Sequence, residues 1–306
     1  MEAKYDIDLK KYKKEEIDKN NKIYTITSKD QKKKEAFTGF VFSDGKIDIG
    51  KINEKINIIK SFENPAILKV LGYNYIILKG KVPIILTECI ANKKLVKLSD
   101  LFKSQNLTDT KRYIIAIGIA LGMNYLHSKS FIHTNLYSSE ILLDENLYPH
   151  ISCLSYLDDE TQASNNDFPQ YIKKKSHSKI TNVYSYSKII YELLAQTKLE
   201  KFERRDQEPN FSIFGEKMKD FFEVCYNGPE NDVPTFDQIL KFFINEEDFK
   251  EEFSELEEDE IEKYFRIFKE QIPTVLEKSN TASTDNHEED SGTDNENTAN
   301  RGEATK

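Results

Sequence analysis

Residues 131–144 read "FIHTNLYSSEILLD" and decide how the rest of the chain is interpreted. An apolar lead-in and His133 come before a short polar loop, and an apolar run ending in Asp144 follows. The preceding stretch, "LTDTKRYIIAIGIALGMNYLHSK", is long and apolar, with Thr108 or Asp109 as its expected cap. The sequence therefore predicts a helix, a polar loop and a buried strand, in that order.

The pattern of apolar residues differs between the first third of the chain and the rest. Residues 15–90 contain short runs rich in Ile, Tyr, Phe and Thr between polar turns, which predicts strands. Ile52, Ile56 and Ile59 have helical spacing and predict one helix among those strands. Beyond residue 97 the apolar pattern is mostly helical. A strand-rich part followed by a helix-rich part predicts an α+β fold.

Composition excludes several classes of function. The net charge of −9 argues against nucleic acid as a partner, and no apolar run approaches the roughly 18 residues of a membrane span. Cys89, Cys153 and Cys225 have spacings that match neither a disulfide framework nor a zinc site, so we expect a reduced, cytoplasmic location. Residues 277–306 lack large apolar side chains and are predicted to form a disordered acidic and polar tail. We expect a solubilising tail; a phosphorylation target and an interaction segment are the alternatives.

Five segments resemble motifs of the eukaryotic protein kinase family and follow one another in the family's order and spacing. They are most similar to the tyrosine-kinase-like branch. The opening stretch is similar to the catalytic loop H-R-D-L-K-x-x-N and the strands that lead to D-F-G. The other four segments are "SFENPAILKVLGY", "VPIILTECI", "TNVYSYSKIIYELLAQTK" and "CYNGPENDVPTFDQIL". The resemblance implies a bilobal fold with a small antiparallel β lobe that contains helix αC and a larger, mainly helical lobe. It places the N-lobe at 10–90, the C-lobe at 91–248, a helical extension at 249–276 and the tail at 277–306.

The resemblance also implies that most charged catalytic positions carry other residues. The catalytic-loop Asp corresponds to Asn135, whose amide is a negligible base. The Asp of D-F-G corresponds to Cys153, and a thiol is a poor ligand for magnesium. The phosphate-covering loop contains no glycine that would allow close backbone approach. The remaining correspondences are Thr134, Tyr137, Glu140, Leu154 and Ser155 in the C-lobe, and Asp18, Lys19, Asn20, Asn21, Phe40 (the strand lysine) and Lys55 (its glutamate partner) in the N-lobe.

Two ion pairs of the family have lost both members. Phe40 and Lys55 replace one pair; Phe168-Pro169-Gln170, at the A-P-E motif, and Val233 replace the other. A lone charge in a partly buried cleft is costly, so loss of one partner favours loss of the other. The family's helix aspartate is Asn182, whose amide can still support the loop by hydrogen bonds.

Several of these residues have a functional and a structural interpretation. We expect His133 to pack and hydrogen-bond rather than act as a base, and Cys153 to be inert rather than a reactive thiol or metal ligand. Lys55 could replace the missing lysine on a phosphate. Glu140 could hold a divalent ion, but we expect it to sit in solvent.

The cleft itself is expected to be filled. By resemblance, Thr87 is the gatekeeper and Glu88, Cys89 and Ile90 form the hinge. Their backbone groups could bind an adenine-like ring between Ile23 and Leu142, with Thr38 also lining the cleft. We favour a cleft filled by Phe40, with no cofactor and no metal; ATP without magnesium is the alternative.

The resemblance therefore leads us to expect a pseudokinase, which is not an enzyme. It would act as a signalling scaffold or as an allosteric partner of other proteins, such as an active kinase or its substrate. The alternative is an ATP-binding or weakly active atypical serine/threonine/tyrosine kinase with relocated catalytic groups. In that case Lys55 would contact phosphates, and Glu140, with Asp144 or Asp158, would hold the metal.

Overall fold

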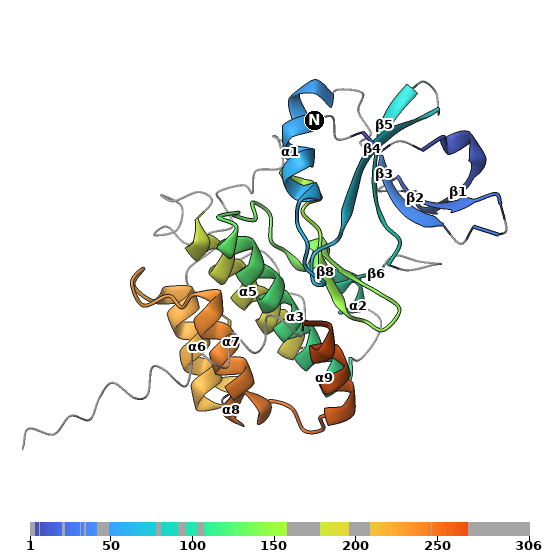
Figure 1. Cartoon of the computed structure of the whole chain (residues 1–306). Helices are drawn as coiled ribbons and strands as arrows, with labels where there is room; N and C mark the ends of the chain where they lie inside the picture. Colours follow the sequence, from blue (N-terminus) through green and yellow to red (C-terminus); the bar gives the residue numbers. More distant parts are fainter. Residues whose placement is uncertain are drawn as a thin grey trace, which may run out of the picture.

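The computed structural model describes residues 4–5, 7–19, 22–30, 32–33, 35–41, 49–77, 81–90, 96–102, 107–157, 178–195, 209–245 and 247–268. A β-sheet with one helix against it lies above a mainly helical part (Figure 1). The predicted α+β fold with two lobes is confirmed. No helix in the described part of the chain combines the length and apolarity needed to cross a bilayer.

The upper sheet has five strands in the order β1-β2-β3-β5-β4, and every neighbouring pair is antiparallel. Burial does not alternate along β2 and β3: Thr25 and Ile26 are both buried, as are Phe37 and Thr38. Because neighbouring residues of a strand point to opposite faces, both faces of the sheet are covered there. The strands are β1 (Tyr12–Asp18), β2 (Ile23–Ser28), β3 (Ala36–Val41), β4 (Val70–Ile77) and β5 (Lys81–Glu88).

Helix α1 (Ile49–Lys60) packs on this sheet. Ile52, Ile56 and Ile59 are all buried, which confirms the helix predicted from their spacing. They share one core with β4, β5 and the helical part. A smaller apolar cluster around Ile26 and Leu86 packs separately. The main core therefore runs continuously from the sheet into the helices.

The helical part surrounds α3 (Asp109–Ser128), which is buried along most of its length. Thr108 is its N-cap, because its side chain accepts a hydrogen bond from the Lys111 N–H. A short sheet of β6 (Val96–Lys97), β7 (Ile141–Leu143) and β8 (Pro149–Ile151) borders it. The other helices are α2 (Leu98–Leu101), α5 (Lys179–Leu194), α6 (Glu216–Asn227), α7 (Phe236–Asn245), α8 (Glu247–Lys250) and α9 (Glu258–Phe265).

Short 3-10 turns connect these elements: η1 (Leu9–Lys11), η2 (Ser138–Glu140), η3 (Leu154–Leu157), η5 (Phe211–Ile213) and η6 (Arg266–Phe268). The two parts of the fold are joined through the backbone before β4. Leu68 N–H donates to the Ile151 carbonyl at 3.0 Å, and Ile151 N–H donates to the Ala66 carbonyl at 2.7 Å. The predicted boundaries at residues 90 and 248 stay predictions.

The loop that follows α3 is held by one buried amide. Asn182 of α5 accepts hydrogen bonds at its Oδ1 from the His133 N–H and from His127 Nε2, both at 3.0 Å. Its Nδ2 donates to the His133 carbonyl at 2.6 Å. The amide thus satisfies both backbone groups of His133, which water could not reach at this depth. The expected supporting role of Asn182 is confirmed.

We predict that Asn182→Ala lowers the free energy of unfolding by about 2–4 kcal/mol, because it leaves buried donors and an acceptor without partners. Chemical denaturation followed by circular dichroism measures this. Gln238→Ala is the matched control, since that exposed amide also makes two hydrogen bonds, both to Thr235. The control should lose no more than about 1 kcal/mol. Equal losses in both variants would show that the Asn182 amide does not hold the loop.

Candidate functional site

His133 is fully committed to structure. Its Nε2 lies 2.8 Å from the Ser152 carbonyl, and its Nδ1 accepts a hydrogen bond from the Asn135 N–H at 3.3 Å. Burial lowers the pKa of His133 to about 4, so the ring is neutral at physiological pH. With Nε2–H donating and Nδ1 accepting, neither nitrogen is available to take a proton from a substrate. The structural interpretation of His133 therefore holds.

Glu140 is the ionisable group that stands out at this site. It ends η2, directly before β7, and is only partly exposed. Burial raises the pKa of Glu140 to about 7; the charge of Lys97 and hydrogen bonding to Ser155 and Ser152 oppose the rise without cancelling it. The expectation that Glu140 sits in solvent is wrong, because β6 and the segment after β8 enclose its carboxyl group.

Cys153 lies beside this carboxyl group and is buried. Burial raises the pKa of the Cys153 thiol well above its ordinary value, and the negative charge of Glu140 raises it further. The thiol therefore stays protonated at neutral pH, and a protonated thiol is neither a good nucleophile nor a metal ligand. Leu154 is buried next to it in η3, as expected for the apolar residue of D-F-G.

The family implies magnesium, and the residues present do not fit it. No group of three or more His, Cys, Asp or Glu side chains in the described part of the chain could hold a metal ion. Of the carboxylates that the structure describes, Glu140 is the one that acts on Cys153, and the thiol at the second ligand position is neutral. A hard cation needs several oxygen ligands. We therefore derive no step through a magnesium ion.

Phe40 and Thr38 lie on β3 between the cleft-lining strands. In register, Phe40 is opposite Ile23 of β2 and Ile85 of β5, and it packs against the main core while remaining partly exposed. Thr38 is buried opposite Thr87. Ile23 and Leu142, the residues expected to sandwich a ring, are each 2% exposed. A nucleotide base therefore enters between them only if β2 and β7 separate.

The hinge residues are tied to the strand beside them. Thr87 is fully buried, and its hydroxyl donates to the Glu88 carbonyl at 3.0 Å. Glu88 N–H donates to the Lys69 carbonyl at 3.0 Å, while the Glu88 carboxylate accepts from the Lys69 N–H at 2.9 Å. Cys89 and Ile90 follow and are partly exposed. Lys69, which the sequence did not single out, thus fixes the start of the hinge.

Two other candidates lie away from the carboxyl group of Glu140. The Lys55 ammonium sits over the ring of Tyr156, 5.3 Å from its centroid. Asp144 accepts hydrogen bonds from the N–H groups of Asn146 and Tyr148, both at 2.8 Å, and so shapes the β7–β8 turn as expected. Asp158, Asn20, Asn21 and the segment 168–170 fall outside the described residues.

Lys97 and Ser152 belong to the site but were not predicted, and Ser155 was predicted only as the third residue of the D-F-G position. Lys97 is brought there by the pairing of β6 with β7, where it lies opposite Leu142. Ser152 N–H also donates to the Glu140 carbonyl at 2.8 Å. The signal in the sequence for Ser152 is its place directly before the D-F-G position; the strand pairing that supplies Lys97 leaves no such signal.

Comparison with known proteins gives the family. A family model described as "Protein tyrosine and serine/threonine kinase" matches residues 41–243. Cysteine-rich receptor-like protein kinase 25 of Arabidopsis thaliana is 30% identical over 172 residues, which is 51% of this chain and 25% of the relative. Tyrosine-protein kinase receptor svh-2 of Caenorhabditis elegans is 30% identical over 170 residues, 48% of this chain and 14% of the relative. The chain thus matches a quarter or less of these relatives' length.

This finding overturns one prediction. We expected a protein that is not an enzyme, but the matching model describes kinases, and the similar proteins from both organisms are named as kinases. The substituted positions in the sequence do not outweigh this. With a family model that spans 203 of its 306 residues, from 41 to 243, the chain belongs to the protein kinase family.

Proposed function

We propose that this chain is an atypical, weakly active protein kinase that binds ATP between its two lobes and transfers the γ-phosphoryl group to a hydroxyl group of another protein. The observation that carries the proposal is the carboxyl group of Glu140, whose pKa is raised to about 7 at the family's catalytic loop. Membership of the kinase family supports the reaction class.

The position of Glu140 argues for function rather than for folding. When the pKa of a carboxyl group is raised by folding, its ionised form is less stable in the folded chain than in water. Ionisation of Glu140 at neutral pH therefore lowers the free energy of unfolding. A glutamine or leucine there would avoid that cost. Strongly perturbed titratable groups of this kind cluster at functional sites. Neighbouring Lys97, Ser152 and Ser155 keep the ionised form accessible near pH 7.

In the proposed reaction Glu140 accepts the proton of the substrate hydroxyl. A general base works best when its pKa lies near the working pH, and general acid–base catalysis contributes roughly 10²–10⁴-fold. Asn135, at the family's base position, has an amide that takes up no proton at neutral pH. The reaction is expected to be slow, because electrostatic stabilisation of the phosphoryl group supplies most of the catalysis in this family.

In this proposal the nucleotide binds in the cleft between the two lobes. Ile23 and Leu142 would part to admit the base, and the hinge at 88–90 would provide backbone hydrogen bonds. ATP would bind without a tightly held magnesium ion, as the set of oxygen ligands is incomplete. We propose a protein as the substrate. We propose a reducing, cytoplasmic setting because Cys153 and Cys225 are buried and form no disulfide.

The raised pKa of Glu140 makes stability depend on pH. Between about pH 4.5 and 7 the folded chain holds a proton that the unfolded chain has lost, so the free energy of unfolding falls as pH rises through this window. We predict that Glu140→Gln removes this part of the fall and is the more stable form at pH 8, by at most about 3 kcal/mol. Urea unfolding across the pH range measures the difference from the wild type. Glu223→Gln, on the exposed face of α6, is the control and should keep the wild-type fall in this pH window. A fall that persists in Glu140→Gln, or that is lost in both variants, would contradict the assignment.

Phosphoryl transfer is tested with γ-labelled ATP and a mixed set of Ser, Thr and Tyr peptides, with magnesium and with a chelator. We predict slow transfer whose rate rises through about pH 7 as Glu140 ionises, and a loss of about 10²-fold in Glu140→Gln. Glu223→Gln should retain the wild-type rate. Absence of transfer by the wild type under both conditions, or an unchanged rate in Glu140→Gln, would refute the proposed function.

A further inference from the structure

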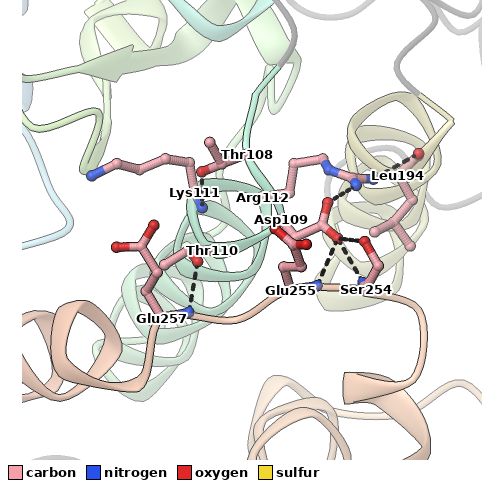
Figure 2. A network of polar contacts seen from close by, with 9 residues as sticks. All are labelled: Thr108, Asp109, Thr110, Lys111, Arg112, Leu194, Ser254, Glu255 and Glu257. Atoms are coloured by element: carbon pink, nitrogen blue, oxygen red, sulfur yellow. Dashed lines mark hydrogen bonds and ion pairs between the residues drawn. The ribbon is translucent and has the colours of Figure 1, made fainter.

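The chain beyond α7 folds back onto the start of α3, outside the segment that the family model matches (Figure 2). Asp109, in the first turn of α3, accepts a hydrogen bond from Ser254, which lies 145 positions further along the chain. Its Oδ2 accepts from the Ser254 N–H at 2.6 Å, from the Ser254 hydroxyl at 2.8 Å and from the Glu255 N–H at 3.3 Å. Its Oδ1 pairs with Arg112. The carboxylate of Asp109 therefore holds residues 254–255 against the start of α3.

Two further contacts continue the attachment toward α9. Glu257 N–H donates to the Thr110 hydroxyl at 2.9 Å, and Lys111 pairs with Glu260. Phe253 packs against the ring of Tyr113, with centroids 5.5 Å apart. The segment 253–268, which we call the C-terminal strap, is thus held by apolar packing at Phe253 and by polar contacts from 254 to 260.

Ser254 is exposed and lies between α8 and α9, where the backbone is neither helix nor strand. An exposed, irregular segment can adopt the extended shape that a modifying enzyme needs. The residues that follow it are strongly acidic, reading "SELEEDE" from Ser254 to Glu260. Such a sequence complements a basic substrate groove. The Ser254 hydroxyl is also one of the three donors to Asp109 Oδ2.

We propose that Ser254 is a phosphorylation site for an acidophilic serine kinase and that its phosphate releases the C-terminal strap from α3. In the transfer, the Ser254 Oγ forms a bond to the γ-phosphorus of ATP and the bond to the β–γ bridging oxygen breaks. The hydroxyl proton passes to the base of the modifying kinase, and ADP leaves. The modifying kinase is a separate enzyme, so this inference does not depend on the activity proposed for Glu140.

Release follows from charge and hydrogen bonding. The phosphorylated oxygen has no proton to donate to Asp109, and it carries about −1.5 to −2 charges at neutral pH. Burial opposes ionisation of Asp109, but hydrogen bonds from Ser254 and Arg112 together hold its pKa below the ordinary value, so the carboxylate is charged. Arg112 also donates to the Leu194 carbonyl of α5 at 3.1 Å, and its guanidinium lies 5.7 Å from the centroid of the Phe253 ring, so its position is already set by Asp109, Leu194 and Phe253. Two anions would then face each other where a hydrogen bond stood.

The C-terminal strap and the start of the hinge line one cavity. Tyr264 of α9 packs against Tyr148 of the β7–β8 turn in a tilted arrangement, with ring centroids 4.7 Å apart. Tyr264 and the exposed Ile267 line a cavity of about 510 Å³ together with Glu88 and Lys69, the pair that fixes the start of the hinge. Release of the C-terminal strap would therefore remove Tyr264 and Ile267 from the lining of a cavity that Glu88, the first hinge residue, also lines.

The test treats the full chain with ATP and a purified casein-kinase-type acidophilic kinase, maps phosphate by mass spectrometry and follows backbone hydrogen exchange. We expect phosphate on Ser254 and about a tenfold or greater rise in exchange over 257–265, with α5 unchanged. Ser254→Ala is the matched control, because it keeps every other hydroxyl that the kinase can modify, including those of 277–306. It should take up phosphate elsewhere without the rise.

The variant Asp109→Asn tests whether the strap is released by repulsion between the Ser254 phosphate and the Asp109 carboxylate, or by the phosphate alone. The amide still accepts hydrogen bonds but carries no charge, so phosphorylation of this variant should change exchange over 257–265 by less than about threefold. No phosphate on Ser254 would overturn the proposal. So would phosphorylated wild type with unchanged or slower exchange, the latter because Arg112 had captured the phosphate.

Discussion

The buried amide of Asn182 is the contact on which this fold depends. A loop that crosses the interior must satisfy its backbone groups there, because unpaired buried N–H and C=O groups are costly. Asn182 does this for both backbone groups of His133 and also binds His127 of α3. His133 in turn holds the Ser152 carbonyl after β8. A single amide thus links α3, α5 and the two segments that enclose Glu140.

This arrangement explains how Glu140 comes to be desolvated. The loop and the segment after β8 are fixed by uncharged hydrogen bonds. Among the residues that the structure describes, Lys97 is the cation that acts on the Glu140 carboxyl group, and burial outweighs it. In a more typical member of the family, several carboxylates and a metal would share this site. Here one carboxyl group with a pKa near 7 and a protonated thiol occupy it.

The sequence predicts those features that depend on local spacing. The helix at Ile52, Ile56 and Ile59, a cap at Thr108 or Asp109 and the order of strands before helices are readable from nearby residues. The amide support from Asn182 was implied by the resemblance to the kinase family. The environment of Glu140 is not, since it depends on the β6–β7 pairing and on side chains from three segments. The position of Lys55 over Tyr156, and the contact of Asp109 with a strap 145 residues away, likewise arise only in three dimensions.

The family assignment shows a similar limit. Substituted motif positions led us to expect an inactive protein, because each position was judged by the charge it had lost. That reasoning cannot detect a group such as Glu140, whose chemistry comes from burial rather than from residue type. Direct titration of Glu140 by carbon NMR, using side-chain-labelled glutamate with Glu140→Gln to assign the signal, tests this account most directly. The account predicts that the pKa of Glu140 is about 7 and rises further when ATP binds. A Glu140 pKa near 4.5 that does not change on addition of ATP would contradict it.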